Sequence, residues 1–202
     1  MPSILNIRNG LESAHLPANM RFALLGLGLF TFLQILVPHA AIGQEGRTTL
    51  EDQVKGAYLY NFAKFVDWPP ETFPNPNSPL SLCILGKSPF TPEFENQLRE
   101  KKVHDRSLEV RHVTDAEEAS SCQILFIPVS EQSRLQDVIA GLKGKSILLV
   151  GETPDFDELG GMIQFILEGG TVRFKINLPS AKHSGLQISS KLLQVAMASE
   201  QK

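Results

Sequence analysis

Short apolar runs separated by helical segments constrain the fold of this chain most. Residues 122–127 read Cys-Gln-Ile-Leu-Phe-Ile, and residues 146–150 read Ser-Ile-Leu-Leu-Val. Runs this apolar predict strands that are covered on both faces. Two further strands are expected, one ended by Gly86 and one that alternates as an outer strand, at residues 80–86 and 108–113. Helices expected at 90–102 and 130–142 lie between these runs, so right-handed crossovers and a mostly parallel sheet follow.

A hairpin closes the predicted sheet. Apolar side chains alternate along residues 163–167 and again along residues 172–176. Gly169 and Gly170 lie between these segments and tolerate the positive φ that a tight turn needs. From Leu178 to the end the pattern predicts one helix. The fold class is therefore α/β: a single three-layer domain, with a mostly parallel sheet, helices on both faces and a C-terminal antiparallel hairpin.

The aromatic stretch at residues 57–70 predicts a helix that packs on this sheet. It contains both tyrosines, the only tryptophan and two of the twelve phenylalanines. Apolar side chains recur every three or four residues, which is the spacing of one helix face. Asp67-Trp68-Pro69-Pro70 then ends the helix, because the residue before a proline avoids helical conformation. Most of this face is expected in the core, with Tyr60, Lys64 and Trp68 off the main stripe or at its end.

The N-terminal segment has the pattern of a secretory signal peptide. Arg21 precedes an apolar run from Phe22 to Val37, and Ala41-Ile42-Gly43 resembles a cleavage site. The sequence thus predicts a signal peptide at 1–43 and one α/β domain at 44–202. A retained membrane anchor is the alternative, although Gly26, Gly28 and Gln34 interrupt the run.

Charge and motifs argue against several functions. The net charge of −3 does not favour nucleic-acid binding. The Gly-Lys-Ser triplets at 86–88 and 144–146 lack the earlier glycine of a phosphate-binding loop. The histidines of the mature chain are isolated, which does not favour a metal site. We find no arranged nucleophile and base, so the sequence predicts a protein that is not an enzyme and needs no cofactor.

The two cysteines, Cys83 and Cys122, have two readings. In a reducing cytosol they would be buried thiols, whereas in an oxidising compartment an even pair is a disulfide candidate. The strands that carry them are expected side by side, at the switch in strand order. This places a bond between the two sulfurs within reach.

Four blocks of sequence resemble the YfiR-like family of periplasmic proteins. The likeness runs from about Leu50 to Val195, and the blocks occur in the family's order: Tyr58-Leu-Tyr-Asn-Phe-Ala-Lys-Phe-Val-Asp-Trp-Pro69, Gly160-Gly-Met-Ile-x-Phe165, Val172-Arg-Phe-x-Ile-Asn177 and Ile188-Ser-Ser-Lys-Leu-Leu193. Cys83 and Cys122 also fall where such proteins have a cysteine pair. Some members have a second pair near the Gly-Gly-Met block, and this chain has no cysteine there.

This resemblance implies a periplasmic repressor of a membrane-bound diguanylate cyclase, the enzyme that makes cyclic-di-GMP. Such repressors bind the periplasmic sensor region of the cyclase, an outer-membrane lipoprotein can sequester them, and homodimers are usual. A binder of this kind needs apolar anchors on a rigid scaffold. The candidates for partner contact are Tyr60, Phe65, Trp68 and Phe73, around the Pro69-Pro70 corner.

Two other functions are considered. A periplasmic small-molecule sensor or carrier would use the crevice at the carboxyl ends of the strands, where residues 86–88 and 128–130 are expected to meet. An exported hydrolase is the other, and the missing catalytic constellation argues against it.

Overall fold

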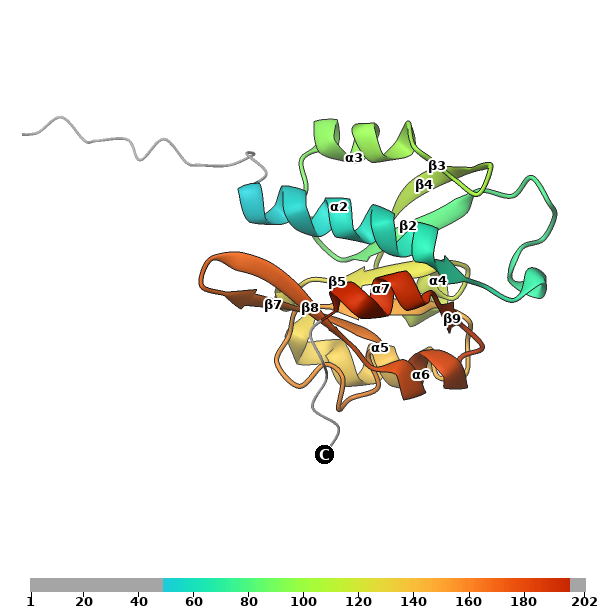
Figure 1. Ribbon diagram of the computed structural model, residues 1–202. Coiled ribbons are helices and arrows are strands. Elements are labelled where there is room, and N and C mark those ends of the chain that lie inside the picture. Colours follow the sequence, from blue (N-terminus) through green and yellow to red (C-terminus); the bar gives the residue numbers. More distant parts are fainter. Residues whose placement is uncertain (1–48, 197–202) are drawn as a thin grey trace, which may run out of the picture. The chain divides into compact units, whose positions relative to one another are not determined.

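The seven-stranded sheet follows the expected parallel topology. The computed structural model describes residues 49–196, and its sheet has the order β3-β4-β2-β5-β6-β7-β8. The pairs β4–β2, β2–β5, β5–β6 and β6–β7 are parallel, whereas β3 and β8 add antiparallel edges. Figure 1 shows this arrangement. The strands are β2 (Leu80–Leu85), β3 (Lys102–Val103), β4 (Arg106–Val113), β5 (Ile124–Ile127), β6 (Leu148–Gly151), β7 (Ile163–Glu168) and β8 (Thr171–Ile176).

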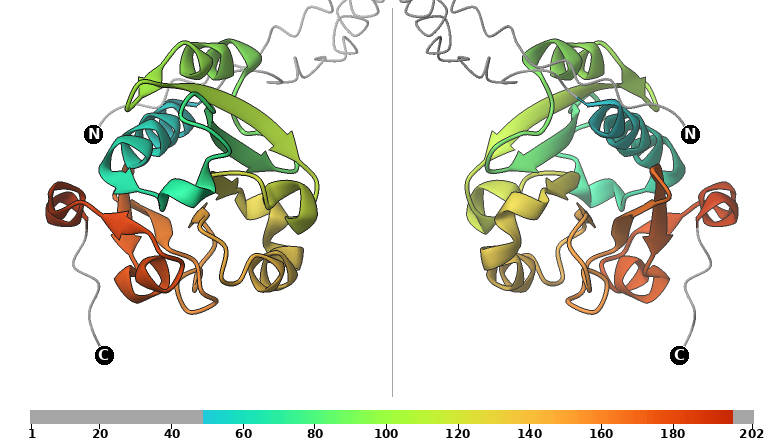
Figure 2. Two further views of the ribbon diagram at one scale, coloured as in Figure 1. Left: turned by 90° about the vertical axis from the view of Figure 1, so that its right-hand side faces the viewer. Right: turned by 90° about the vertical axis from the view of Figure 1, so that its left-hand side faces the viewer.

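Helices cover both faces of the sheet, as predicted. The crossover from β2 to β4 contains α3 (Pro92–Arg99), and the crossover from β5 to β6 contains α5 (Leu135–Gly141). From β2 the chain crosses to β4 on one side, and from β5 it crosses to β6 on the other side. Because both connections are right-handed, α3 and α5 lie on opposite faces of the sheet. Figure 2 shows α2 (Leu50–Phe65) on the opposite side of the central strands from α5 and α4 (Ala116–Ala119). Every residue of β2, β5 and β6 is buried, which explains their apolar runs.

The aromatic helix α2 packs its face against the closing hairpin. The Phe62 ring lies 5.8 Å from the Phe165 ring and 5.0 Å from the Phe174 ring, centroid to centroid. Tyr58 lies 5.2 Å from Phe174 in an edge-to-face contact. Such aromatic pairs stabilise a core beyond the area that they bury. The predicted core helix is therefore confirmed.

Both ends of α2 have clear causes. Thr49 and Asp52 form a capping box, in which each side chain bonds the other residue's backbone amide. At the other end the chain becomes extended at Val66, before the prolines that the sequence marks as the stop. Val66–Asp67 forms β1, which is followed by the 3₁₀ turn η1 (Pro70–Thr72). Pro69 disfavours helical conformation only at the residue before it, Trp68, so the helix could have continued to Asp67. It ends two residues earlier, at Phe65.

The single C-terminal helix expected from Leu178 onward is wrong. The chain instead forms α6 (Leu178–His183), β9 (Gln187–Ile188) and α7 (Ser190–Val195). Gly185 has a φ of +77°, a left-handed conformation that ends α6. β9 then pairs antiparallel with β1 in a second, two-stranded sheet. This long-range pairing overrides the local helical pattern.

Two expected helix boundaries also differ. The helix expected over 90–102 ends at Arg99, because Lys102–Val103 turns back as β3 to pair with β4. The segment expected as a helix from Ser130 begins with the 3₁₀ helix η2 (Val129–Arg134) before α5 starts. The predicted signal peptide, residues 1–43, lies outside the described residues.

Gly161 has no room for a side chain. A Cβ there would lie 2.1 Å from the Phe156 ring and 2.6 Å from the Phe156 carbonyl oxygen. We expect Gly161→Ala to lower the free energy of unfolding by about 2–3 kcal/mol, because the backbone oxygen cannot move aside. Urea denaturation would measure this loss. Gly169→Ala is the control: its site is open and only its positive φ is strained, so it should lose about 1 kcal/mol. Equal losses for both variants would contradict the steric explanation.

Candidate functional site

A crevice lies at the carboxyl ends of the parallel strands. The loops that follow β2, β5 and β6 meet there, together with β7 and the first turns of α2. The two segments that the sequence places at this edge both line the crevice, through Lys87 and Ser88 and through Pro128, Val129 and Ser130. The cavity has a volume of about 540 Å³. This lies within the range of small-molecule sites, at the switch in strand order where open α/β sheets bind ligands.

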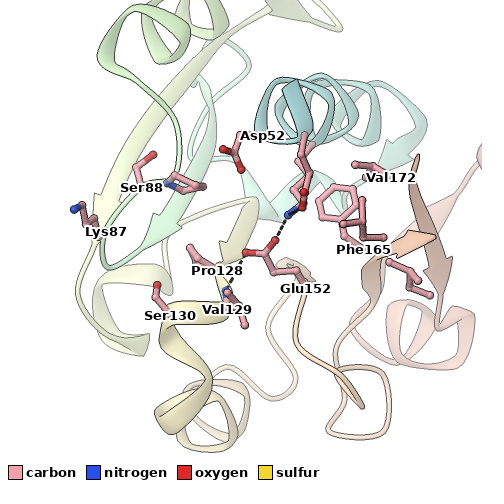
Figure 3. A pocket seen from close by; sticks show the side chains of 14 residues that line it. Asp52, Lys87, Ser88, Pro128, Val129, Ser130, Glu152, Phe165 and Val172 are labelled. Atoms are coloured by element: carbon pink, nitrogen blue, oxygen red, sulfur yellow. Dashed lines mark hydrogen bonds and ion pairs between the residues drawn. The ribbon is translucent and has the colours of Figure 1, made fainter. Parts of the chain in front are cut away.

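A buried ion pair spans the floor of this crevice. The Lys55 ammonium on α2 contacts a Glu152 oxygen just after β6, and it also lies 2.6 Å from Glu51. The Lys55 and Glu152 side chains are only 10% and 13% exposed. The other Glu152 oxygen accepts a hydrogen bond of 3.0 Å from the Val129 amide after β5. Figure 3 shows the pair between the helix and the two loops. One carboxylate therefore ties α2 to the ends of two strands.

The charge of Lys55 is stabilised by its partners. Burial alone would lower the pKa of Lys55, but the hydrogen bonds to Glu152 and Glu51 and their charges outweigh it. The net effect raises the pKa of Lys55 above its ordinary value, so the side chain is a cation at every physiological pH. The ion pair is thus a fixed part of the cavity floor.

The remaining walls of the crevice are mostly apolar. Phe165, Ile166 and Leu167 of β7 line one side, with Val172 of β8 beside them. Pro128 and Val129 face them from the end of β5 (Figure 3). An apolar cavity with a few fixed polar groups is typical of a binding site.

Metal-ligating side chains do not cluster within the described residues. Between residues 49 and 196 no group of three or more His, Cys, Asp or Glu side chains is placed to hold a metal ion. His112 contacts the buried Glu95 carboxylate at 2.9 Å, and Arg99 reaches the same carboxylate at 3.3 Å. This cluster joins α3 to β4, and the half-exposed His112 side chain thus has a structural partner.

The four aromatic candidates are half-buried, and Tyr60, Phe65 and Trp68 pack against the core. Tyr60 donates a hydrogen bond of 3.3 Å to the Lys102 carbonyl in β3, and the Lys64 ammonium lies 5.3 Å from its ring centre. The same ammonium lies 5.9 Å from the Phe65 ring centre. Lys64 thus brings Tyr60 and Phe65 together at the exposed side of α2.

Trp68 and Phe73 are held in place by the strands beside them. The Trp68 indole N–H donates a hydrogen bond of 3.1 Å to the Gln123 carbonyl at the start of β5. The Arg106 guanidinium stacks 3.9 Å from the Phe73 ring centre and bonds the Ser78 carbonyl at 2.7 Å. Each ring has a structural contact and a remaining exposed part. Contact of Tyr60, Phe65, Trp68 and Phe73 with a partner stays a prediction.

The structure joins Cys83 and Cys122 in a disulfide. Cys83 lies in β2, and Cys122 lies two residues before the neighbouring strand β5. Their Cα atoms are 6.0 Å apart, and both residues are buried. The described residues contain no free cysteine. A bond of this kind persists in an oxidising compartment.

Comparison with known proteins decides the family. A family model described as YfiR/HmsC-like matches residues 52–197, which is most of the chain. The chain belongs to the YfiR/HmsC-like family. The family suggests periplasmic regulation of diguanylate cyclase signalling. None of the helices between residues 49 and 196 is long and apolar enough to span a membrane.

A solved structure is similar to part of this chain. It is the crystal structure of a conserved domain protein from Vibrio cholerae O1 biovar El Tor, with 10% sequence identity and a TM-score of 0.43. The match covers 58% of this chain and 54% of that protein. The chain thus spans about half of the length of the structure that it matches.

Sequence reasoning missed Lys55 and Glu152. Both are single charged residues, 97 positions apart, and no motif connects them. Two local signals point to them. Lys55 lies next to Val54, a position of the apolar stripe of the helix, and Glu152 directly follows a buried strand at the edge where ligands bind. Only the fold places these two side chains together.

Proposed function

We propose that this protein is an exported periplasmic binding protein that represses an inner-membrane diguanylate cyclase. It would do so by binding the periplasmic sensor region of the cyclase and holding the cytoplasmic catalytic domain inactive. The observation that carries this proposal is the YfiR/HmsC-like family match over residues 52–197. The buried disulfide supports an oxidising compartment.

The proposed regulation needs competition between partners. An outer-membrane lipoprotein that sequesters the repressor would shift it away from the cyclase, because a ligand shifts an equilibrium by its differential affinity. A homodimer of the repressor belongs to the same proposal. Sedimentation of the mature protein alone tests whether it forms a homodimer. Sedimentation with the periplasmic domain of the cyclase tests whether the two proteins form a complex.

The direct test is a reconstitution in cells. Co-expression of the full chain with a membrane diguanylate cyclase that has a periplasmic sensor region, from the same organism, should lower cyclic-di-GMP, measured by mass spectrometry, relative to the cyclase alone. A chain without residues 1–43 stays in the cytosol in this proposal and should not repress. Unchanged cyclic-di-GMP with the full chain, or equal repression by the truncated chain, would contradict the proposal.

Replacing Trp68 tests whether the four aromatic candidates contact a partner. We expect Trp68→Ala to weaken binding of the periplasmic cyclase domain about tenfold or more, because Trp anchors dominate many interfaces. The indole is also bonded to Gln123, so about 2 kcal/mol of stability should be lost as well. Calorimetric titration measures the affinity, and urea denaturation measures the stability.

Phe94→Ala is the matched control for Trp68→Ala. Phe94 is also a half-buried aromatic residue, but it lies on α3 and packs near Gly56. The Phe94→Ala variant should lose a similar amount of stability and keep its full affinity for the periplasmic cyclase domain. If both variants bind the cyclase domain equally well, or equally badly, Trp68 is a core residue and not a contact.

A second candidate function rests on the cavity. A small-molecule sensor or carrier would use the crevice of about 540 Å³ and its fixed ion pair. Thermal shifts of the mature protein with a metabolite panel, measured without any partner, would identify such a ligand.

A further inference from the structure

The outer half of β7 has a strand on only one side. β7 pairs with β8 along its whole length, from Ile163 to Glu168. It pairs with β6 only at Ile163 and Gln164, because β6 ends at Gly151 and the chain turns away at Glu152. Within the described part of the chain, residues 165–168 therefore have no strand on the β6 side. In an antiparallel pair alternate residues bond the partner strand, so about half of these backbone groups point to the open side.

The crevice runs along this open edge. Consecutive residues of a strand point to opposite faces of the sheet, so a cavity over one face would touch every second residue. The crevice is lined by Phe165, Ile166 and Leu167 in succession, and by Val172 on β8. It therefore extends over one face of the hairpin and also reaches the open edge of β7, in the place where β6 would continue. We call this place the β7 slot, bounded by residues 165–168 on one side and residues 128–130 on the other (Figure 3).

Apolar side chains flank the slot on both sides. Leu167 is 56% exposed on the β7 side, and Val129 is 53% exposed on the β5 side. The far edge of the sheet is different, because β8 carries Arg173 and Lys175, and charged residues discourage pairing at an edge strand. Residues 165–167 of β7 include neither a charge nor a proline. Apart from Glu168 at its end, which pairs with Arg173, the β7 side of the slot thus lacks the charges and prolines that usually protect a strand edge from pairing.

The charge around the slot is negative. Its lining contains three carboxylates, Glu51, Asp52 and Glu152, and two ammonium groups. Lys55 is already paired with two of the carboxylates. Lys87 is exposed, and Figure 3 shows its ammonium at the far side of the crevice from Glu152. A partner with a basic side chain is therefore complementary to this lining.

We propose that the β7 slot binds an extended segment of the cyclase's periplasmic sensor region as an added strand. The segment has apolar side chains at alternate positions, which contact Leu167 and Val129, and a lysine or arginine that faces Asp52 and Glu152. Backbone hydrogen bonds to β7 supply affinity without sequence specificity, and the flanking side chains supply the selection. This inference rests on the proposed function and names the surface that would carry it.

Amide exchange tests the added strand directly. The probe is the purified periplasmic domain of the cyclase, added to the ¹⁵N-labelled mature protein. In the free protein, alternate amides of residues 165–168 should exchange slowly, because they bond β8, and the others should exchange fast. Binding should slow the fast set at least about tenfold. If the domain binds and these amides continue to exchange fast, no strand is added at β7.

Two surface variants provide the second test. Leu167→Lys and Val129→Lys place a cation at the slot, and both sites are exposed, so the fold should persist. Each should weaken binding of the cyclase domain about tenfold, through lost apolar contact and repulsion of the basic segment. Leu159→Lys is the control, since it makes the same change at a leucine that is 41% exposed and does not line the slot.

The outcomes separate the two proposals. If the wild-type protein binds the cyclase domain and the slot variants bind it equally well, the slot inference is wrong and the proposed function stands. If the wild-type protein does not bind the domain, both are wrong. If a second copy of this chain fills the slot, Leu167→Lys will abolish dimerisation and leave cyclase binding intact, which also overturns the inference.

Discussion

Replacing Cys83 and Cys122 together by alanine is expected to lower the free energy of unfolding by about 4 kcal/mol. The bond closes a loop between positions 39 residues apart. A crosslink across a loop of this length removes about that much entropy from the unfolded chain. Because β2 and β5 are already neighbours in the sheet, the folded state needs no rearrangement when the bond is lost. Urea denaturation of the oxidised protein and of the double variant measures the difference.

The reduced wild-type protein is the control for this variant. Its unfolding free energy should match that of the double variant within about 1 kcal/mol, because the entropic effect is the same and only small side-chain volumes differ. A double variant as stable as the oxidised protein would show that the bond contributes nothing to folding.

The burial of the two sulfurs also predicts how the bond responds to reductant. Cys83 is 0% exposed and Cys122 is 1% exposed, so a thiolate cannot reach either sulfur in the folded state. We expect reduction to proceed only through unfolding, with a rate that rises with added urea. Fast reduction of the folded protein would identify the bond as a redox sensor instead.

Lys55→Met is expected to lower the free energy of unfolding by about 3–5 kcal/mol. The variant leaves the Glu152 carboxylate buried without its cation, and breaking a buried ion pair from one side has this effect. It also leaves Glu51 near a second carboxylate with nothing between them. Chemical denaturation of the variant and the wild type at neutral pH measures the loss.

A double-mutant cycle isolates the ion pair. Glu152→Gln removes the second charge and keeps an oxygen that can accept the Val129 amide. The double variant Lys55→Met/Glu152→Gln should therefore be more stable than Lys55→Met alone, by at least about 1 kcal/mol. If the double variant loses the full sum of the two single-variant losses in free energy of unfolding, the two side chains do not interact. The ion pair then contributes nothing to holding the crevice floor together.

The same ion pair predicts a dependence on alkaline pH. The pKa of Lys55 is raised in the folded protein above its ordinary value of 10.5. The unfolded state therefore loses this proton first, and the contribution of the pair is complete below pH 10.5. It should be lost as the pH rises through the folded-state pKa. The stability curves of the wild type and Lys55→Met should converge only as the pH rises above 10.5.

Patterns close together in the chain were sufficient for the strands β2, β4, β5, β6, β7 and β8 and for the helix α2, but not for the short strands β1, β3 and β9. Apolar runs such as 122–127 mark strands covered on both faces, and the alternation around Gly169 marks the hairpin, because side-chain periodicity reflects local backbone geometry. The strand order around β2 and β5 then follows from short right-handed crossovers. These same rules place Lys87 and Ser130 at one edge of the sheet.

The sequence by itself thus determined the α/β class, the buried strands, the aromatic core helix and the family. The tertiary structure decided the pairing of β1 with β9, the Lys55–Glu152 ion pair and the open edge of β7. Each of these depends on where distant segments stop relative to one another. β6 ends before β7 does, and Glu152 meets a lysine 97 residues earlier. Periodicity describes one segment at a time, so it contains no information on such relative lengths and long-range contacts.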